Sequence, residues 1–284
     1  MTPNKPTRSE QREAARAKAR EMREQHKKGE QRKKLFLRLG IVAAILGSVA
    51  IVTSVVVSGA NKVELTPANF SFNDGVKIGA NLEAYTKTST PTPSATPSSG
   101  SAEVPNIIMY VDYQCPICQA FEVPNSSQIE SWVKSGSVTL EIHPVSFLDS
   151  RASLNQYSSR AGNAAICVAE YSPNSFLAYN NLLFANQPEE GTAGPDNAEL
   201  ADRAKEAGVS NLEQITSCIN NKSFGSWVES ATTRILNEMV PGTEIKMGGT
   251  PTIVVNGKQY VFATAEELAS PARFAQFVQE ASAN

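Results

Sequence analysis

The longest apolar run in the chain lies near its N-terminus, from Leu39 to Val57. Its nineteen residues, LGIVAAILGSVAIVTSVVV, include no charged side chain. At about 1.5 Å per residue, a helix of this length spans the apolar core of a bilayer. The basic segment 1–38 precedes the run, and basic flanks stay on the cytoplasmic side of a membrane. The pattern predicts a single-pass cell-membrane protein with a cytoplasmic tail (1–38), a transmembrane anchor (39–58) and an extracytoplasmic body.

A cleaved signal peptide is the alternative interpretation, because Ser58-Gly59-Ala60 offers small residues for cleavage. Signal peptides usually have a short basic segment and an apolar region of roughly 7–15 residues. Here the basic segment has 38 residues and the apolar run is longer. An uncleaved anchor fits these lengths better.

The segment after the anchor, residues 59–103, predicts an extracytoplasmic linker. Within it, NFSFNDGVKIG alternates well enough for a strand at about residues 70–79, with Asn-Asp-Gly as a turn. Residues 86–103, TKTSTPTPSATPSSGSAE, are too rich in Ser, Thr and Pro to bury a core. We expect the strand to dock on the sheet of the following domain, with residues 86–103 as a surface excursion.

From residue 104 to residue 284 the pattern alternates between strands and helices. An apolar strand is predicted first, buried on both faces, then a helix from Cys115, a second strand, a helical block, a hairpin around Asn256-Gly257 and a final helix. The predicted strands are Asn106–Tyr113, Ser137–His143, Thr252–Val255 and Lys258–Ala263. The predicted helices are Cys115 to about Lys134, a helical block at about 150–240 with breaks at 186–197 and near Gly208, and about Ala265–Ala281.

Charge is distributed unevenly although the net charge of the 284 residues is only −2. Residues 1–38 hold thirteen Lys/Arg and five Asp/Glu, whereas the rest holds thirteen and twenty-three. The tail is expected to be a solvated helix or disordered, in contact with anionic lipid head groups. Nucleic-acid binding would need a defined reading element, and none is visible, so no nucleic acid is expected as a partner.

Two of the four cysteines form the motif Cys115-Pro116-Ile117-Cys118 directly after the first strand. A thiol attacks a disulfide only as thiolate, so its pKa must fall from about 8.5. A helix N-terminus favours the anion, and Pro116 suits the first helical turn. The motif predicts an exposed nucleophile at Cys115 and a resolving thiol at Cys118.

Two other interpretations of this motif carry less weight. A zinc site needs about four ligands, but the only histidines are His26, in the tail, and His143. A purely structural disulfide would close so short a loop that it constrains the unfolded chain little. We therefore expect no metal and no organic cofactor.

The other two cysteines, Cys167 and Cys218, lie fifty-one residues apart in the helical block. Disulfides persist outside the cell, and an even count leaves no odd thiol. They predict a structural disulfide between two helices, with free buried thiols as the alternative.

The run YVDYQCPICQAFE, followed much later by GGTPTIVVNGK, resembles the DsbA-like thiol–disulfide oxidoreductases. The resemblance covers about Val104 to Ala283. It implies an α/β thioredoxin-like fold with an inserted helical domain, here preceded by a single transmembrane helix.

The resemblance also implies roles for individual residues. Cys115 matches the nucleophile and Cys118 the resolving cysteine. Thr250 and Pro251 match a cis-proline loop that contacts the active-site sulfurs and presents backbone groups to a substrate strand. With Pro116 and Ile117 they would form the active-site surface.

Two carboxylates also match family positions. Glu122 and Asp112 are candidates for a proton relay. An exposed helix glutamate and a strand-end turn residue are the alternatives.

One departure bears on the direction of exchange. The best-known oxidant of the family has histidine where this chain has Ile117, which cannot donate a hydrogen bond or a positive charge to the Cys115 thiolate. Strong oxidants owe their power to a stabilised reduced form.

The leading hypothesis is a membrane-tethered oxidoreductase that gives disulfides to exported proteins with cysteine thiols and is reoxidised by a membrane redox partner. A reductase or isomerase would use the same residues. A non-catalytic thioredoxin-fold module that binds polypeptides is the other alternative, but it needs no nucleophile at a helix start. A metal chaperone is disfavoured because Met and His ligands are lacking near the motif.

Overall fold

The computed structural model describes residues 64–69, 74–88, 104–149 and 156–283, which belong to one compact unit, Glu64–Asn284. The predicted tail, the predicted anchor and residues 89–103 lie outside these ranges. Within them, no helix is both long enough and apolar enough to cross a membrane.

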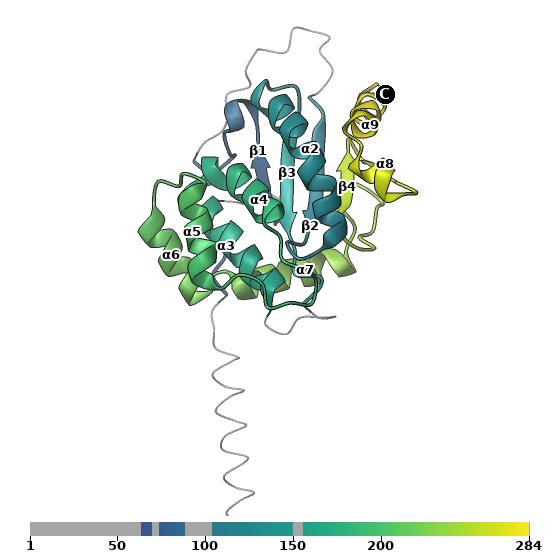
Figure 1. The fold of residues 1–284 in the computed structure, drawn as a ribbon. Coiled ribbons are helices and arrows are strands. Elements are labelled where there is room, and N and C mark those ends of the chain that lie inside the picture. The colour runs from purple at the N-terminus through teal and green to yellow at the C-terminus, as the bar shows by residue number, and fades with distance from the viewer. Residues whose placement is uncertain (1–63, 70–73, 89–103, 150–155, 284) are drawn as a thin grey trace, which may run out of the picture. The chain divides into compact units, whose positions relative to one another are not determined.

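Five strands form one mixed sheet in the order β1-β3-β2-β4-β5 (Figure 1). β2 pairs with β3 in parallel, from Asn106 opposite Thr139 to Val111 opposite Pro144. The pairs β1–β3, β2–β4 and β4–β5 are antiparallel. The strand bounds are β1 Val76–Ile78, β2 Asn106–Val111, β3 Thr139–Pro144, β4 Thr252–Val255 and β5 Lys258–Gln259.

Helices follow the strands and build a block between β3 and β4 (Figure 1). Their bounds are η1 Ala80–Leu82, α2 Pro116–Lys134, α3 Tyr157–Tyr171, η2 Pro173–Ser175, α4 Phe176–Ala185, α5 Asn197–Glu206, α6 Leu212–Asn221, α7 Gly225–Asn237, α8 Ala265–Ala269 and α9 Pro271–Ser282.

The central strand β2 is buried on both faces, as its continuous apolar run predicts. Because side chains alternate along a strand, Ile107, Met109 and Val111 enter the main core with α2, α3 and α9, while Tyr110 enters a second cluster on the other face. The cysteines of the CPIC motif belong to the main core, so the motif lies on the face that α2 covers.

The helical block is organised around α3, most of which is buried. Small residues allow this close packing: a Cβ at Gly162 would lie only 3.0 Å from a methyl of Val228 in α7. A disulfide joins Cys167 of α3 to Cys218 of α6, with 5.9 Å between their Cα atoms.

Several local predictions agree with the structure. β1 lies inside the predicted strand at 70–79 and docks on β3, and α2 ends at Lys134. The Asn256-Gly257 turn joins β4 to β5, with positive φ at both residues, as a type I′ hairpin requires.

Some predicted bounds were wrong, among them those of the first and last strands. β2 ends at Val111 rather than Tyr113, because the chain turns there and the Cys115 N–H donates to the Asp112 carbonyl. The return strand β5 is only two residues long.

The final helix is two helices, α8 and α9, rather than one. Proline disfavours a helical conformation in the residue before it. Ser270 is accordingly extended, and its side chain caps α9 by accepting from the Arg273 N–H.

Candidate active site

The CPIC motif lies where β2 leaves the sheet and α2 begins. Cys115 is the N-cap residue of α2 and Pro116 occupies the first turn, where a missing N–H has no cost. The Cys115 N–H donates to the Asp112 carbonyl (3.0 Å), and the Cys115 carbonyl accepts the first helical bond from the Gln119 N–H (3.2 Å). Strand end and helix start are thus joined by a tight turn that fixes the direction of the Cys115 side chain.

The two sulfurs are unbonded in this structure and differ in burial. Cys115 is 6% exposed and Cys118 is fully buried. The expectation of an exposed nucleophile was therefore wrong, because the strand-to-helix turn and the Thr250 loop enclose Cys115. It remains the more accessible thiol of the pair.

The two thiols have opposite pKa shifts. The pKa of Cys115 falls to about 6, chiefly because the Cys118 thiol donates a hydrogen bond to it. Burial opposes this shift, while the Thr250 side chain and the N–H groups of Cys118 and Ile117 support it. Burial raises the pKa of Cys118, and its hydrogen bond and charge interaction with Cys115 raise it further. At neutral pH, Cys115 is the thiolate and Cys118 the neutral thiol.

The Thr250–Pro251 loop faces Cys115 from the start of β4. Its peptide bond is cis, as the resemblance implies. The Cys115 sulfur lies 3.2 Å from the Thr250 carbonyl oxygen, so the protonated thiol can donate to it. The buried Thr250 hydroxyl has no hydrogen-bond partner in the described part of the chain. It is therefore free to turn toward the Cys115 sulfur, whose pKa the Thr250 side chain lowers.

Asp112 is fully buried at the end of β2. Its carboxylate accepts from the Gln114 N–H (2.9 Å), the Leu148 N–H (2.9 Å) and the Ser158 hydroxyl (2.6 Å). Burial raises its pKa to about 6, and these hydrogen bonds oppose the shift. Through its bonds to Gln114 and Ser158, Asp112 joins the active-site turn to α3 of the helical block. Asp112 is therefore more than a strand-end turn residue.

Glu122 is also buried, one turn beyond Cys118, so the alternative of an exposed helix glutamate was wrong. Burial raises its pKa to about 8, and a hydrogen bond from Asn180 opposes the shift. Among the described residues, its Oε1 atom has no hydrogen-bond partner. Glu122 lines a cavity of about 340 Å³ between α2 and α4, together with Asn181 and Leu182. It is therefore a neutral carboxyl group at neutral pH.

Apolar side chains surround the motif. Ile117 is 43% exposed and Val123 50% exposed on α2, and Val261 beyond β5 is 75% exposed. Pro116, Ala120 and Val123 line a shallow groove with Ala265 and Ala269 of α8. A second groove runs along residues 248–252 and 259–262. This surface suits an extended, partly apolar polypeptide.

Three glutamines around the motif were not singled out in the sequence. Gln114 and Gln119 flank it in the chain and could have been noticed. Gln187 comes from the loop after α4, yet its amide donates to the Cys115 carbonyl at 3.0 Å. Only the tertiary structure brings it there.

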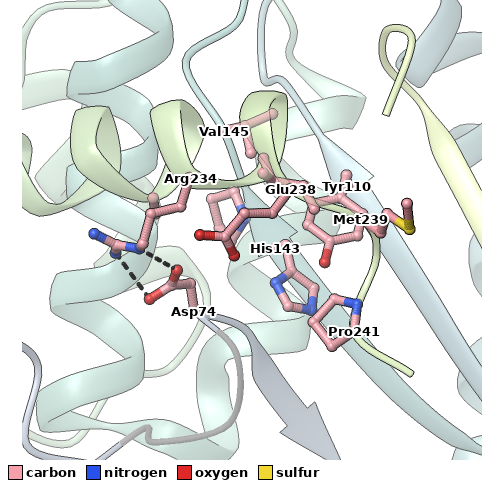
Figure 2. A pocket seen from close by; sticks show the side chains of 11 residues that line it. Asp74, Tyr110, His143, Val145, Arg234, Glu238, Met239 and Pro241 are labelled. Atoms are coloured by element: carbon pink, nitrogen blue, oxygen red, sulfur yellow. Dashed lines mark hydrogen bonds and ion pairs between the residues drawn. The ribbon is translucent and has the colours of Figure 1, made fainter. Parts of the chain in front are cut away.

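A second cavity, of about 280 Å³, lies on the opposite face of the sheet. Figure 2 shows the Arg234–Asp74 ion pair on one side of it and Met239 and Pro241 on the other. In its wall, His143 stacks on Tyr110 (4.3 Å between centroids) and its Nε2 lies 2.8 Å from Glu141. No cysteine lines this cavity, so it is separate from the thiol chemistry.

Comparisons with known proteins agree with this geometry. A family model described as "Thioredoxin" matches residues 92–280. The reduced DsbG disulfide oxidoreductase of Mycobacterium tuberculosis is 29% identical, with 75% of this chain and 90% of that one covered at a TM-score of 0.57. Reduced DsbA from the same organism is 28% identical, with 74% and 93% covered at 0.54.

A curated relative is similar over a shorter stretch. Serine/threonine-protein kinase PknE of Mycobacterium tuberculosis is 29% identical over 159 residues, which are 54% of this chain. This chain spans about a quarter of the length of that kinase, since the match covers 27% of it.

The family model covers well over half of the chain, and the DsbG and DsbA structures each cover about three quarters of it. The chain therefore belongs to the thioredoxin family and, within it, to the DsbA-like thiol–disulfide oxidoreductases.

Proposed function

We propose that this chain is a membrane-tethered, extracytoplasmic oxidoreductase that donates disulfides to exported proteins through Cys115 and Cys118. The opposite pKa shifts of these two thiols, in a helix start enclosed by Thr250 and Pro251, carry the proposal. The tether rests on the sequence, in which the apolar run 39–57 and its basic flank predict an anchor at 39–58.

The reaction begins from the Cys115–Cys118 disulfide. A substrate thiolate attacks the Cys115 sulfur, which forms a mixed disulfide and breaks the bond to Cys118. Cys118 leaves as a thiolate and takes up a proton. A second substrate thiolate then attacks the substrate sulfur of the mixed disulfide, and Cys115 leaves. The substrate loses two electrons and gains a disulfide, while the enzyme becomes the reduced dithiol.

The environment of each group suits its step. The lowered pKa of Cys115 makes it a good leaving group. The raised pKa of Cys118 makes it a poor one, so a proton donor is needed. Glu122, whose pKa is about 8, is protonated at neutral pH and lies one turn away. We assign it as the proton relay, with Asp112 in the supporting role of fixing the turn.

The remaining assignments follow the same logic. Thr250, Pro251, Pro116 and Ile117 would contact an extended substrate segment, with backbone groups of the loop as hydrogen-bond partners. A membrane redox partner or a small disulfide would reoxidise the dithiol. The catalytic domain would comprise residues 104–284 with its helical insertion at about 150–240, tethered by the linker 59–103.

The test is the reduction potential of the pair in the full-length protein, equilibrated with glutathione buffers. A value near roughly −120 to −180 mV supports disulfide donation or isomerisation, whereas a value near roughly −270 mV makes the protein a reductase. Cys115→Ser should reduce exchange to the uncatalysed rate, and Cys118→Ser should accumulate mixed disulfides. Retained turnover in Cys115→Ser would contradict the mechanism.

A further inference from the structure

The loop between α4 and α5, residues 186–196, is held rigidly by the helical block; we call it the strap. Arg160 of α3 donates to the Pro195 carbonyl (2.6 Å) and to the Ala193 carbonyl (2.9 Å). Gly194 has φ +59°, and a Cβ there would lie 2.6 Å from the Tyr157 ring. The strap therefore has little freedom to move relative to α3.

The strap and the end of α4 are also bonded to residues on both sides of the CPIC motif. Before the motif, the buried Gln114 side chain donates to the Thr192 carbonyl at 3.0 Å. After it, the Gln119 side chain donates to the Phe184 carbonyl at the end of α4 (2.9 Å). Between them, the Gln187 amide of the strap donates to the Cys115 carbonyl at 3.0 Å. Three glutamine side chains thus join the active-site turn to the helical block by hydrogen bonds.

The Cys115 carbonyl belongs to the same residue as the nucleophilic sulfur. Its oxygen carries partial negative charge, which repels a thiolate nearby. The Gln119 N–H and the Gln187 amide both donate to this oxygen, and each donor screens part of that charge. The same two bonds hold the first turn of α2 so that the Ile117 and Cys118 N–H groups face the sulfur.

We propose that Gln187 is a positioning residue for thiol–disulfide exchange, whose amide holds and screens the Cys115 carbonyl and thereby stabilises the Cys115 thiolate. The inference rests on the proposed function and deepens it. The effect differs between redox states, because the thiolate is charged while the disulfide is neutral. Gln187 therefore shifts the equilibrium toward the reduced enzyme and makes the protein a stronger disulfide donor.

The experiment compares the full-length wild type with Gln187→Met, which keeps the size and removes the donor, and Gln187→Glu, which adds an acceptor and a charge. Asn186→Ala is the matched control, since the exposed Asn186 side chain of the strap donates to the Leu182 carbonyl and not to the active-site turn. The readouts are the pH dependence of Cys115 alkylation by iodoacetamide and the redox equilibrium with glutathione.

A lost hydrogen bond of this kind changes an equilibrium by about two- to tenfold. Gln187→Met should shift the redox equilibrium by that factor toward the disulfide and move the alkylation midpoint to higher pH. Gln187→Glu should shift both further in the same direction, and Asn186→Ala should leave both unchanged. Gln187 is half-buried, so thermal unfolding is used to check that each variant folds. If Gln187→Met does not fold, the Gln187→Glu variant tests the proposal.

The proposal is overturned if the folded Gln187 variants alkylate and equilibrate as the wild type does. This outcome differs from failure of the proposed function. If the wild type does not exchange with glutathione, disulfide donation fails, whereas the alkylation midpoints still report whether Gln187 stabilises the thiolate.

Discussion

The two cysteine pairs of this protein have opposite environments. Cys115 and Cys118 lie at the start of a helix, with the Thr250 carbonyl 3.2 Å from one sulfur and peptide N–H groups facing it. Cys167 and Cys218 lie within α3 and α6, away from either N-terminus, and are bonded to each other. Both pairs are buried. The difference teaches that the polar groups around the sulfur, above all the N–H groups of the helix start, separate a reactive pair from a structural one, whereas exposure does not.

The largest test of this comparison removes the structural pair. The double substitution Cys167→Ser and Cys218→Ser releases a loop of 51 residues, and we expect it to lower the free energy of unfolding by about 4 kcal/mol, as loop entropy predicts for this length. Denaturant unfolding measures the loss. The exchange rate of the folded variant should stay within about twofold of the wild type. A large fall in exchange at unchanged stability would show that the second pair takes part in the chemistry.

The next test concerns Glu122, whose pKa of about 8 in the folded protein lies above the usual glutamate value of 4.5. Between these values the folded state binds more protons than the unfolded state, so this group lowers stability as pH rises through that range. In the wild type, the free energy of unfolding should fall by roughly a few kcal/mol between pH 5 and pH 8 because of this group. Glu122→Gln should remove this fall, so that the variant gains stability over the wild type at pH 8 and not at pH 5.

The same variant tests the proton relay. Glutamine cannot transfer a proton to Cys118, so attack of a substrate thiolate on the Cys115–Cys118 disulfide should slow by about 10²-fold, as stopped-flow fluorescence would measure. Glu213→Gln, which makes the same change at an exposed carboxyl group of α6, is the control. If Glu122→Gln gains stability at pH 8 but its rate of exchange is unchanged, Glu122 is not the proton relay.

The smallest expected effect concerns the Thr250 hydroxyl. Thr250→Val keeps the shape but removes a donor to the thiolate, and a hydrogen bond to a charged group contributes about 1.5–3 kcal/mol. The pKa of Cys115 should therefore rise from about 6 by roughly one to two units, measured as the pH midpoint of alkylation. Thr252→Val is the control, because that hydroxyl donates to the Gly249 carbonyl instead. Equal midpoints in all three proteins would refute the role of Thr250.

The features that could be predicted from the sequence are those that depend on neighbouring residues alone. The helix start at Pro116 and the Asn256-Gly257 hairpin follow from the conformational limits of single residues. The break at Ser270-Pro271 could have been predicted on the same grounds, since the proline is visible in the sequence.

The remainder depends on distant segments. The burial of Glu122 requires α4 to lie against α2, and the contact of Gln187 with Cys115 joins residues 72 positions apart. No periodicity of the chain encodes either contact. The enclosure of Cys115, which overturned the expectation of an exposed nucleophile, has the same origin.

The contact between Cys115 and Thr250 spans 135 residues of the chain. Because synthesis proceeds from the N-terminus, Cys115 and Cys118 leave the ribosome well before Thr250. During that interval the strand-to-helix turn can form, but the hydroxyl and carbonyl of Thr250 are missing from it. The full set of groups around the Cys115 sulfur is therefore complete only after the C-terminal part of the sequence has been made.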